Sequence, residues 1–407
     1  MVRVCFISPS FPYMNCGVGD YTAELVKSLT NSGLQTGVIT SDSEKIKEFA
    51  KTKEIGNFEI FPIVKRWDFA NLHTIVKKIK DFKPDVIHIQ YHWWISNDGL
   101  ILKGLMLVLL PWLLKLSRIK SPVITTLHSR LSGPFLFPKA AFLRHLALIP
   151  LLLFSDKIIV TNRYDGRKLS SWLPFLKNKI VYTLGGSGHY LVDEKLKEEA
   201  ARLKFQLKDS ESEILLSNFG YVIPYKGFEE LLEAMSALRK RGYPLRLVSI
   251  GGFDIELNFA GAYFEKLQKM ARDLNLEEHI KWAGFCDARQ ASLFLLASDI
   301  CVMPFPDGAS EWRSSFLDAL SHGLPVVTTF SEKTPEELVN RVNCLLVPPH
   351  APQRLTTAIE ELISSIELRN SLGRAAQELF EKEYSWTVIG QKTIAVYENE
   401  LRRVVNN

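Results

Sequence analysis

The sequence is poor in cysteine and lacks the patterns that cysteine-based sites require. Five cysteines are scattered over 407 residues, and none of them forms a Cys-x-x-Cys pair or a zinc-type cluster with histidine. Neither a disulfide framework nor a structural zinc site is expected. The cysteines are therefore predicted to be small buried hydrophobes in a reducing compartment.

Long uninterrupted apolar runs are also missing. Leu100–Leu116 and Ala140–Phe154 are the most apolar segments, and each is broken by a proline and by basic residues. A membrane-spanning helix needs about 20 apolar residues, so neither segment is expected to cross a bilayer. Two interpretations stay open for them: helices buried against a sheet, or helices that touch a membrane surface.

Two further signals are absent. No charged n-region precedes the strand-like run Val2–Ile7, so no secretory signal is expected and a cytoplasmic location is predicted. No complete Gly-x-Gly-x-x-Gly fingerprint follows a strand, which disfavours a dinucleotide-dependent dehydrogenase.

Basic residues are concentrated in the first half of the chain. Residues 1–185 hold 25 Lys and Arg against 13 Asp and Glu, a balance of +12, and the rest holds 25 against 32, a balance of −7. The first half is therefore expected to meet something anionic, such as a membrane surface, an acidic glycan or a lipid phosphate. Nothing in the sequence points to a nucleic acid.

Short apolar runs alternate with amphipathic segments along both halves. Such runs predict buried parallel strands separated by helices, and two series of them predict two doubly wound α/β domains. The boundary is placed near 185, where Gly185–Gly188 is interpreted as a hinge and, less favourably, as a phosphate loop. The expected strands are Val2–Ile7, Val86–Ile89, Val123–Leu127, Lys157–Val160, Ile180–Thr183, Ile214–Ser217, Leu245–Ile250, Ile300–Met303, Val326–Thr329 and Cys344–Val347.

Three turns that follow predicted strands carry candidate ligand-binding residues. Gly17, Val18 and Gly19 open a helix after the first strand, where free backbone N–H groups suit an anion. In the second half, Lys226 precedes a helix with apolar Phe228, Leu231, Leu232, Met235 and Leu238, so its ammonium group suits a diphosphate. An ordinary turn and a solvated lysine are the alternatives.

A third turn leads into a helix that begins near Ser314 and is closed by Gly323. Ser314 and Ser315 either cap this helix or bind phosphate oxygens. Asp318, one turn in, is placed to accept hydrogen bonds from ribose hydroxyls, and a solvated carboxylate is the alternative. His128 ends an apolar strand at the edge where α/β sheets bind ligands, which favours a functional role over a structural one.

Taken together, these segments resemble the retaining GT-B glycosyltransferases of family 4, a group that includes sucrose synthases and glycogen synthases. The resemblance covers nearly the whole chain and rests on the order of six motifs. These are Gly17–Gly19, Thr125–His128, Phe219–Gly227, Trp282–Phe285, Ala297–Pro304 and Ser314–Val327.

The resemblance implies two Rossmann-like domains that face each other across a cleft. Residues 1–185 would form the acceptor-side domain, 186–385 the domain that binds the nucleotide sugar, and 386–407 a helix that crosses back to the first domain. The implied reaction moves a sugar from a nucleoside diphosphate to an acceptor hydroxyl with retention of configuration.

Residue by residue, the resemblance assigns these roles. The segment Gly17–Gly19 approaches the donor diphosphate, His128 lies near the transferred sugar, and Lys226 neutralises the diphosphate. Gly220 and Tyr221 are further candidates for donor binding. Gly284 and Phe285 lie near the nucleobase, and Asp318 takes the place of the signature glutamate that holds the ribose.

The chain departs from the family at two positions. The signature glutamate that touches the sugar would fall at Ser310, and Glu311 is the candidate substitute if the loop shifts. Tyr221 stands where an arginine usually accompanies the phosphate lysine, and Arg313 is the candidate replacement for that charge.

No metal and no cofactor are expected, because a metal-binding Asp-x-Asp is absent and Lys226, Arg313 and helix N-termini suit the departing diphosphate. The expected partners are a nucleotide sugar and a glycan or lipid-linked acceptor, with peripheral membrane contact. Two other functions stay open: a nucleotide-sugar epimerase of the same fold, and an inactive sugar-nucleotide-binding protein, which the changes at Ser310 and Tyr221 motivate.

Overall fold

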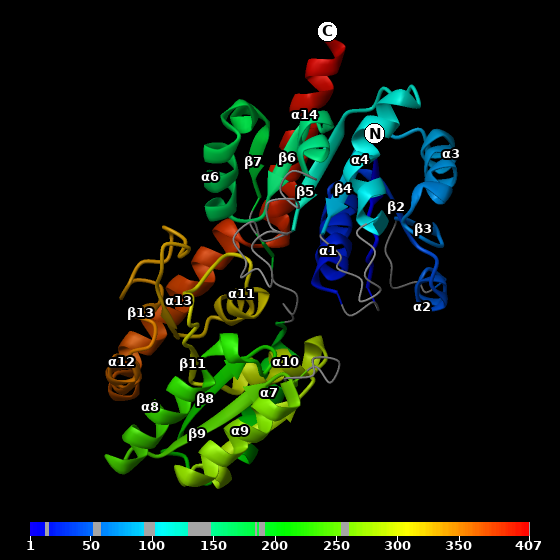
Figure 1. Cartoon of the computed structure of the whole chain (residues 1–407). Coiled ribbons are helices and arrows are strands. Elements are labelled where there is room, and N and C mark those ends of the chain that lie inside the picture. The colour runs from blue at the N-terminus through cyan, green and yellow to red at the C-terminus, as the bar shows by residue number, and fades with distance from the viewer. Residues whose placement is uncertain are drawn as a thin grey trace. The chain divides into compact units, whose positions relative to one another are not determined.

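The computed structural model describes residues 1–12, 16–51, 58–92, 102–128, 148–183, 185–186, 192–253 and 260–406. Within these residues the chain divides into two compact units (Figure 1). Unit 1 consists of Met1–Gly185 together with Trp386–Asn407, and unit 2 consists of Gly186–Ser385. The predicted hinge extends beyond the described residues at Ser187 and Gly188.

Unit 1 is built on a seven-stranded parallel sheet with the order β3-β2-β1-β4-β5-β6-β7. The chain runs outward from β1 in one direction and then from β4 in the other, so the switch point lies between β1 and β4. The strands are β1 Arg3–Ile7, β2 Gln35–Ser41, β3 Glu59–Val64, β4 Val86–Tyr91, β5 Val123–Leu127, β6 Lys157–Val160 and β7 Ile180–Tyr182.

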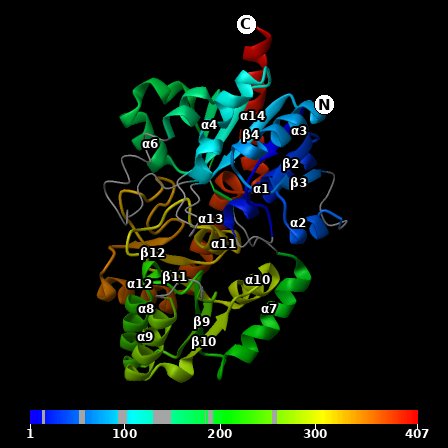
Figure 2. The same ribbon diagram turned by 45° about the vertical axis from the view of Figure 1, so that its right-hand side comes forward.

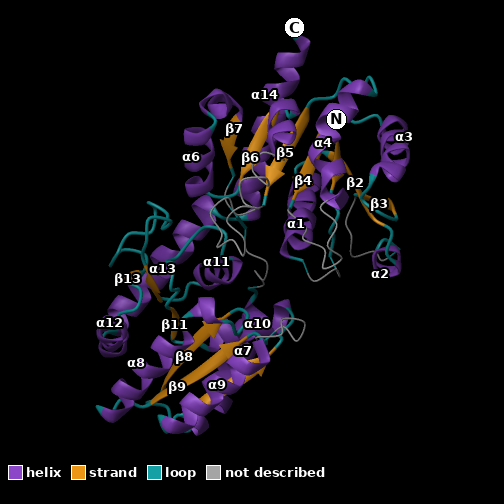
Figure 3. Ribbon diagram, viewed as in Figure 1, coloured by secondary structure: helices purple, strands orange, loops and turns teal. Residues whose placement is uncertain are grey.

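Helices cover both faces of this sheet (Figure 3). One face packs against α1 and α14, and the other packs against α3, α4 and the helical residues 148–154. The helices are α1 Gly17–Asn31, α2 Glu44–Phe49, α3 Leu72–Phe82, α4 Leu102–Leu116, α6 Arg163–Trp172 and α14 Trp386–Val405, with short 3₁₀ turns η2 Phe69–Asn71 and η3 Pro174–Lys179.

The last helix belongs to the first unit. α14 lies beside α1 (Figures 1 and 2), and the Ser28 hydroxyl donates a hydrogen bond to the Trp386 carbonyl at 2.7 Å. Gly390 lets the two helices approach closely, because a Cβ at that position would collide with the Ser28 side chain. Ile389, Val396 and Tyr397 complete the core of this face.

Unit 2 repeats the plan with a six-stranded parallel sheet of order β10-β9-β8-β11-β12-β13. Its switch point lies between β8 and β11. The strands are β8 Ile214–Phe219, β9 Leu245–Ile250, β10 Ile280–Gly284, β11 Ile300–Met303, β12 Val326–Thr329 and β13 Leu345–Val347. The helices are α7 Glu194–Leu207, α8 Phe228–Lys240, α9 Ala260–Asp273, α10 Ala288–Ala297, α11 Ser314–Ser321, α12 Pro352–Ser364 and α13 Ile366–Glu383, with 3₁₀ turns η4 Pro224–Lys226 and η5 Glu277–His279.

The strands that the sequence predicts are present within two residues of the expected bounds. The predicted apolar stripe of α8 is confirmed, since Phe228, Leu231, Leu232, Met235 and Leu238 are fully buried. The sequence patterns do not predict the strands β2, β3 and β10. β3 and β10 are edge strands, and β3 contains Pro62, which is tolerated at an edge but weakens the strand pattern in the sequence.

Candidate functional site

The candidate donor site of unit 2 lies where the chain leaves β8 and β11, the two strands at the switch point of the sheet. Gly220 follows β8 directly, and η4 with Lys226 leads into α8. The segment after β11 runs from Pro304 to α11. Parallel sheets of this kind bind ligands at the carboxyl ends of the strands beside the switch point.

Lys226, Ser315 and Arg313 are brought together at this edge by the two loops. The Lys226 Nζ atom donates a hydrogen bond to Ser315 Oγ at 3.0 Å. Both cations lie over the ring of Phe305, with Lys226 Nζ at 5.3 Å and Arg313 Cζ at 3.9 Å from its centroid. Two positive charges from separate loops therefore share one aromatic ring. The sequence predicts both cations but gives no signal for Phe305, which is fully buried.

Glycine is required at two positions of the lysine loop. Gly220 has φ of +124°, and a Cβ on it would collide with Lys226 Nζ. Gly227 has φ of +69°, and a Cβ there would collide with the Pro304 carbonyl oxygen. These conformations favour glycine, and the absence of a side chain lets the lysine fold back over its own loop toward α11.

Hydrogen bonds hold the arginine loop in place. Arg313 forms an ion pair with Asp307, which also faces Lys333 at 3.4 Å. The Ala309 amide donates to the Thr329 carbonyl at 2.8 Å, and the Ser331 hydroxyl donates to the Asp307 carbonyl at 2.8 Å. Asp307 and Lys333 are functional candidates that the sequence analysis missed, because their pairing spans two loops.

The loop that these contacts hold also carries Ser310 and Glu311, the two residues at the altered signature position. Ser310 is fully buried, and its hydroxyl has no hydrogen-bond partner among the described residues. Glu311 is buried with 3% of its surface exposed. Substitution of Glu311 for the missing glutamate requires a shift of this loop, which the hydrogen bonds of Ala309 and Asp307 oppose.

The first turns of α11 carry the remaining predicted residues of this edge. Ser314 is exposed, Ser315 faces Lys226, and no side chain caps the helix start. The first amide groups of a helix lack intrahelical acceptors, so they remain available to an anion. Asp318 is fully buried on the second turn, so a ribose reaches it only if binding opens a path. Gly323 closes the helix with φ of +68°, as predicted.

An exposed aromatic pair lies beside this site, at the ends of β8 and β10. The rings of Tyr221 and Phe285 meet edge to face with centroids 5.7 Å apart. Tyr221 is 47% exposed and Phe285 is 63% exposed. The backbone of Gly252 lies against the Phe285 ring, and Gly284 accepts a hydrogen bond from the Gly251 amide at 2.9 Å. Exposed aromatic faces of this kind suit a planar nucleobase.

In unit 1 the predicted glycine turn forms the start of α1. Gly17 is exposed, whereas Val18 and Gly19 are buried. Gly19 is needed for packing, because a Cβ there would meet the backbone of Phe11 at 2.9 Å. Cys16 precedes the helix without a side-chain cap, so the first amide groups suit an anion. Asn15, which the sequence places in the same loop, lies outside the described residues.

His128 follows β5 at the carboxyl edge of the unit 1 sheet and is half-buried. Its Nε2 atom lies 2.7 Å from the side-chain oxygen Oε1 of Gln90. Its ring contacts the ring of Tyr21 edge to face, with centroids 4.7 Å apart. Burial, with smaller contributions from His92 and His88, lowers the pKa of His128 to about 3. The imidazole is therefore neutral near pH 7 and suits hydrogen bonding better than proton transfer.

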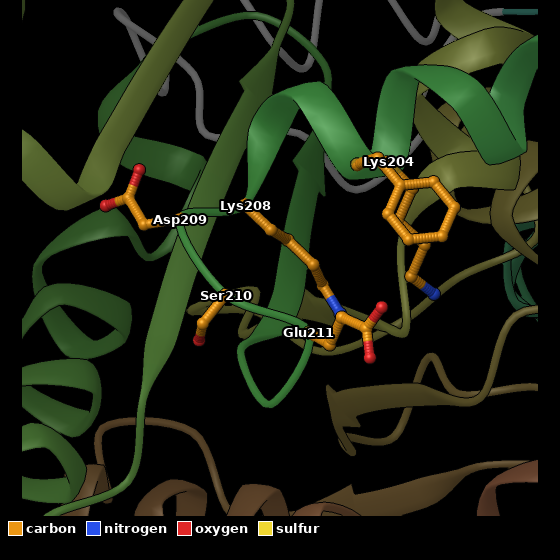
Figure 4. A pocket seen from close by; sticks show the side chains of 6 residues that line it. Lys204, Lys208, Asp209, Ser210 and Glu211 are labelled. Carbon is orange, nitrogen blue, oxygen red and sulfur yellow. The ribbon is translucent and has the colours of Figure 1, made fainter.

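A surface hollow of about 480 Å³ lies elsewhere in unit 2 (Figure 4). It is lined by Lys204, Phe205 and residues 208–211, which precede β8. The hollow therefore lies at the amino edge of the sheet, opposite the edge that carries Lys226. Lys204 and Lys208 both pair with Asp299, so their charge is partly neutralised.

Neither a metal-binding cluster nor a membrane-spanning helix is present in the part of the chain that the structure describes. Among the described residues, no three His, Cys, Asp or Glu side chains are arranged to hold a metal ion. No described helix combines the length and the apolar character that crossing a bilayer requires.

Both units match glycosyltransferase family models. Residues 16–183 match the model "Glycosyltransferase Family 4", and residues 199–379 match "Glycosyl transferases group 1". Among solved structures, a glycosyltransferase from Rickettsia africae covers 100% of this chain and 99% of its own, with a TM-score of 0.72 at 17% identity. Anabaena HepE in complex with UDP covers 98% of this chain and 100% of its own, with a TM-score of 0.72 at 16% identity.

Several curated relatives are named glycosyltransferases. A GDP-mannose-dependent alpha-(1-6)-phosphatidylinositol monomannoside mannosyltransferase of Mycobacterium tuberculosis is 24% identical over 196 residues, which are 47% of this chain and 48% of that protein. This match therefore spans about half the length of the relative. An uncharacterised glycosyltransferase of Methanocaldococcus jannaschii is 24% identical over 98% of both chains. The two parallel α/β units, the two family models and these relatives together place the chain among the GT-B glycosyltransferases.

Proposed function

We propose that this protein transfers a sugar from a nucleoside diphosphate to an acceptor hydroxyl, with retention of configuration and without a metal ion or other cofactor. The observation that carries the proposal is the convergence of Lys226, Ser315 and Arg313 on the carboxyl edge of the unit 2 sheet. A leaving diphosphate gains negative charge as the sugar departs, and preorganised cations and helix amides stabilise that charge.

Other residues are candidates for contacts to the remaining groups of the donor. Tyr221 and Phe285 offer their exposed rings to the nucleobase. Asp318 is the candidate ribose contact, and the start of α1 with Gly17–Gly19 is a second candidate anion site. His128 is the candidate group of unit 1 that meets the transferred sugar. UDP in the HepE complex and GDP-mannose in the name of the mycobacterial relative support a nucleotide sugar as donor.

Calorimetry with UDP, GDP and ADP tests the diphosphate site. Lys226→Ala removes a charge-assisted hydrogen bond worth about 1.5–3 kcal/mol, so the affinity for the nucleoside diphosphate falls about 10- to 150-fold. Lys240→Ala is the matched control, because Lys240 is exposed at the opposite end of α8. Equal affinities in the wild type and Lys226→Ala would remove Lys226 from the site.

Turnover assays distinguish transfer from the two alternatives. Transfer gives a glycosylated product with the anomeric configuration of the donor, at a rate that EDTA leaves unchanged. Release of free nucleotide without an acceptor favours an epimerase-type reaction. Binding of a nucleotide sugar without turnover over a broad panel of acceptors favours an inactive binding protein.

We also propose that unit 1 contacts an anionic membrane that presents a lipid-linked acceptor. The structure leaves fewer residues of the two segments for a membrane contact, because eight of their apolar residues lie in the core: Met106, Leu107, Val108, Leu110, Leu114, Leu148, Leu151 and Leu152. Residues 100–101 and 140–147 lie outside the described residues. The exposed apolar side chains that remain are Trp112, Leu116 and Leu153.

Cations accompany these exposed side chains. Lys115 and Arg403 both pair with Asp156, and Lys179 donates to the Leu153 carbonyl at 2.7 Å. Partial burial and then repulsion from Lys115 lower the pKa of Lys179, so these charges lie close together. Apolar side chains beside clustered cations suit the surface of an anionic bilayer.

Co-sedimentation with phosphatidylcholine vesicles, with and without phosphatidylserine, tests the membrane proposal. Binding is expected to need the anionic lipid, to fall with salt, and to weaken in Leu116→Ser. Phe205→Ser removes an exposed aromatic residue of unit 2 and serves as the control. Failure to bind anionic vesicles at low salt would refute the membrane contact and leave the transferase proposal standing.

A further inference from the structure

A buried chain of polar side chains leads from α14 to His128. His88 and Gln90 lie on one face of β4, and Thr126 lies on the same face of the neighbouring β5, because alternate residues of a strand share a face. His88, Gln90 and Thr126 are fully buried. This is the face that α1 and α14 cover.

The hydrogen bonds run continuously along this chain. Tyr397 Oη lies 2.6 Å from His88 Nδ1, and Thr126 Oγ1 lies 2.7 Å from His88 Nε2. The Gln90 side-chain nitrogen lies 3.3 Å from His88 Nε2, and the Gln90 side-chain oxygen lies 2.7 Å from His128 Nε2. Four side chains thus connect the last helix of the chain to the imidazole at the sheet edge.

The chemistry of the amide group fixes the direction of these bonds. A carbonyl oxygen only accepts, so His128 Nε2 must carry the proton that it donates to Gln90. An amide nitrogen only donates, so His88 Nε2 must accept, which leaves the His88 proton on Nδ1 to be donated to Tyr397. His128 Nδ1 is then unprotonated, and it makes no hydrogen bond to any described residue.

A second contact from α14 holds the same ring. Tyr21 packs edge to face against both His128 and Trp386, with centroid distances of 4.7 and 5.0 Å. Trp386 is the first residue of α14 and is anchored to Ser28 through its carbonyl. The position and the tautomer of His128 therefore both depend on the helix that closes this face.

We propose that Gln90, His88 and Tyr397 are positioning residues that hold His128 as a neutral imidazole with its proton on Nε2, so that Nδ1 accepts a hydrogen bond from a hydroxyl of the transferred sugar. The hydrogen bond to the sugar rests on the proposed function, whereas the tautomer does not. Burial also lowers the pKa of His88 to about 3, so the imidazole of His88 is expected to be neutral as well.

Nitrogen-15 NMR of the histidine-labelled full chain tests the tautomer without any substrate, because ring nitrogen shifts distinguish protonated from unprotonated nitrogens. His128→Asn identifies the His128 signals. The wild type is expected to show the Nε2–H tautomer of His128. Gln90→Glu keeps the accepting oxygen and should retain that tautomer, whereas Gln90→Leu should give a mixture. A proton on Nδ1 in the wild type, or no change in Gln90→Leu, would overturn the proposal.

Ligand binding separates positioning from general loss of structure. In Gln90→Leu the affinity for the free nucleoside diphosphate should match the wild type, while the additional affinity for the nucleotide sugar falls about 10-fold. Tyr397→Phe keeps the ring in the core and should shift the His88 signals, with a smaller loss for the sugar. An equal loss for both ligands in Gln90→Leu would mean a purely structural role. If the wild type binds no nucleotide sugar, the proposed function fails while the NMR result still decides the tautomer.

Discussion

Acid conditions should destabilise unit 1 through the fully buried His88 and the half-buried His128. Burial lowers the pKa of both His88 and His128 from 6.5 to about 3. In the unfolded chain these rings bind protons as the pH falls below about 6.5, whereas the folded chain binds them only near pH 3. Stability is therefore fully present above pH 6.5 and is lost progressively as the pH falls toward 3.

The magnitude at pH 5 follows from the unfolded pKa alone, because the folded pKa lies well below that pH. A difference of about 1.5 pH units at about 1.4 kcal/mol per unit gives about 2 kcal/mol for each histidine. Two histidines together cost about 4 kcal/mol, a large part of the 5–15 kcal/mol that usually stabilises a domain. His88 is the clearer case, because it is fully buried.

The assay must report on unit 1 alone. Pulse-labelling hydrogen exchange along a urea series, read by mass spectrometry on β1 and β4 peptides, gives the unfolding free energy of this sheet at pH 7.5 and at pH 5. In His88→Asn the loss of unfolding free energy between pH 7.5 and pH 5 should be smaller than in the wild type by about 2 kcal/mol. His73→Asn is the control, because His73 is exposed on α3. Identical pH dependence in the wild type and His88→Asn would refute the reasoning.

Three further predictions concern unit 2. Gly227→Ala should lower the unfolding free energy by more than about 1 kcal/mol in urea titrations, because of its positive φ and the clash with Pro304. Gly261→Ala is the control and should not lower it by this amount, because the space around the new methyl group is open. An equal effect of the two substitutions would contradict the steric argument. Asp307→Asn should raise the affinity for a nucleoside diphosphate about two- to fivefold by calorimetry, since it removes one negative charge beside Arg313. A weaker affinity would mean that Asp307 mainly positions the loop. Asp318→Asn should weaken binding of ribonucleoside diphosphates more than of their 2′-deoxy analogues, and equal losses would exclude ribose contact.

Local sequence patterns predict most of the fold. Central strands such as β11 are recognisable because both faces are buried, which gives a continuous apolar run. The edge strand β3 is harder to recognise, because Pro62 interrupts its pattern. Gly323 and the apolar stripe of α8 are predicted correctly, because helix ends and helix faces depend on neighbouring residues.

The candidate site is less predictable where it depends on contacts between distant segments. Lys226 and Arg313 can each be selected from their loops, but the ring of Phe305 over which both cations lie is evident only in three dimensions. The same holds for the chain from Tyr397 to His128, which joins residues far apart in the sequence. Their roles in binding a donor remain predictions that the proposed experiments test.

The position of α14 has a consequence for synthesis of the protein. Residues 386–405 cover one face of a sheet whose strands end before residue 183. A ribosome makes all of unit 2 before this helix emerges, so the second unit can fold while the first still exposes apolar side chains that α14 covers, such as Tyr21, which packs against Trp386. Such exposed apolar surface favours aggregation of nascent chains. We therefore expect unit 1 to need chaperones during translation until α14 docks on its sheet. Premature termination before α14 is expected to destabilise unit 1 more than unit 2.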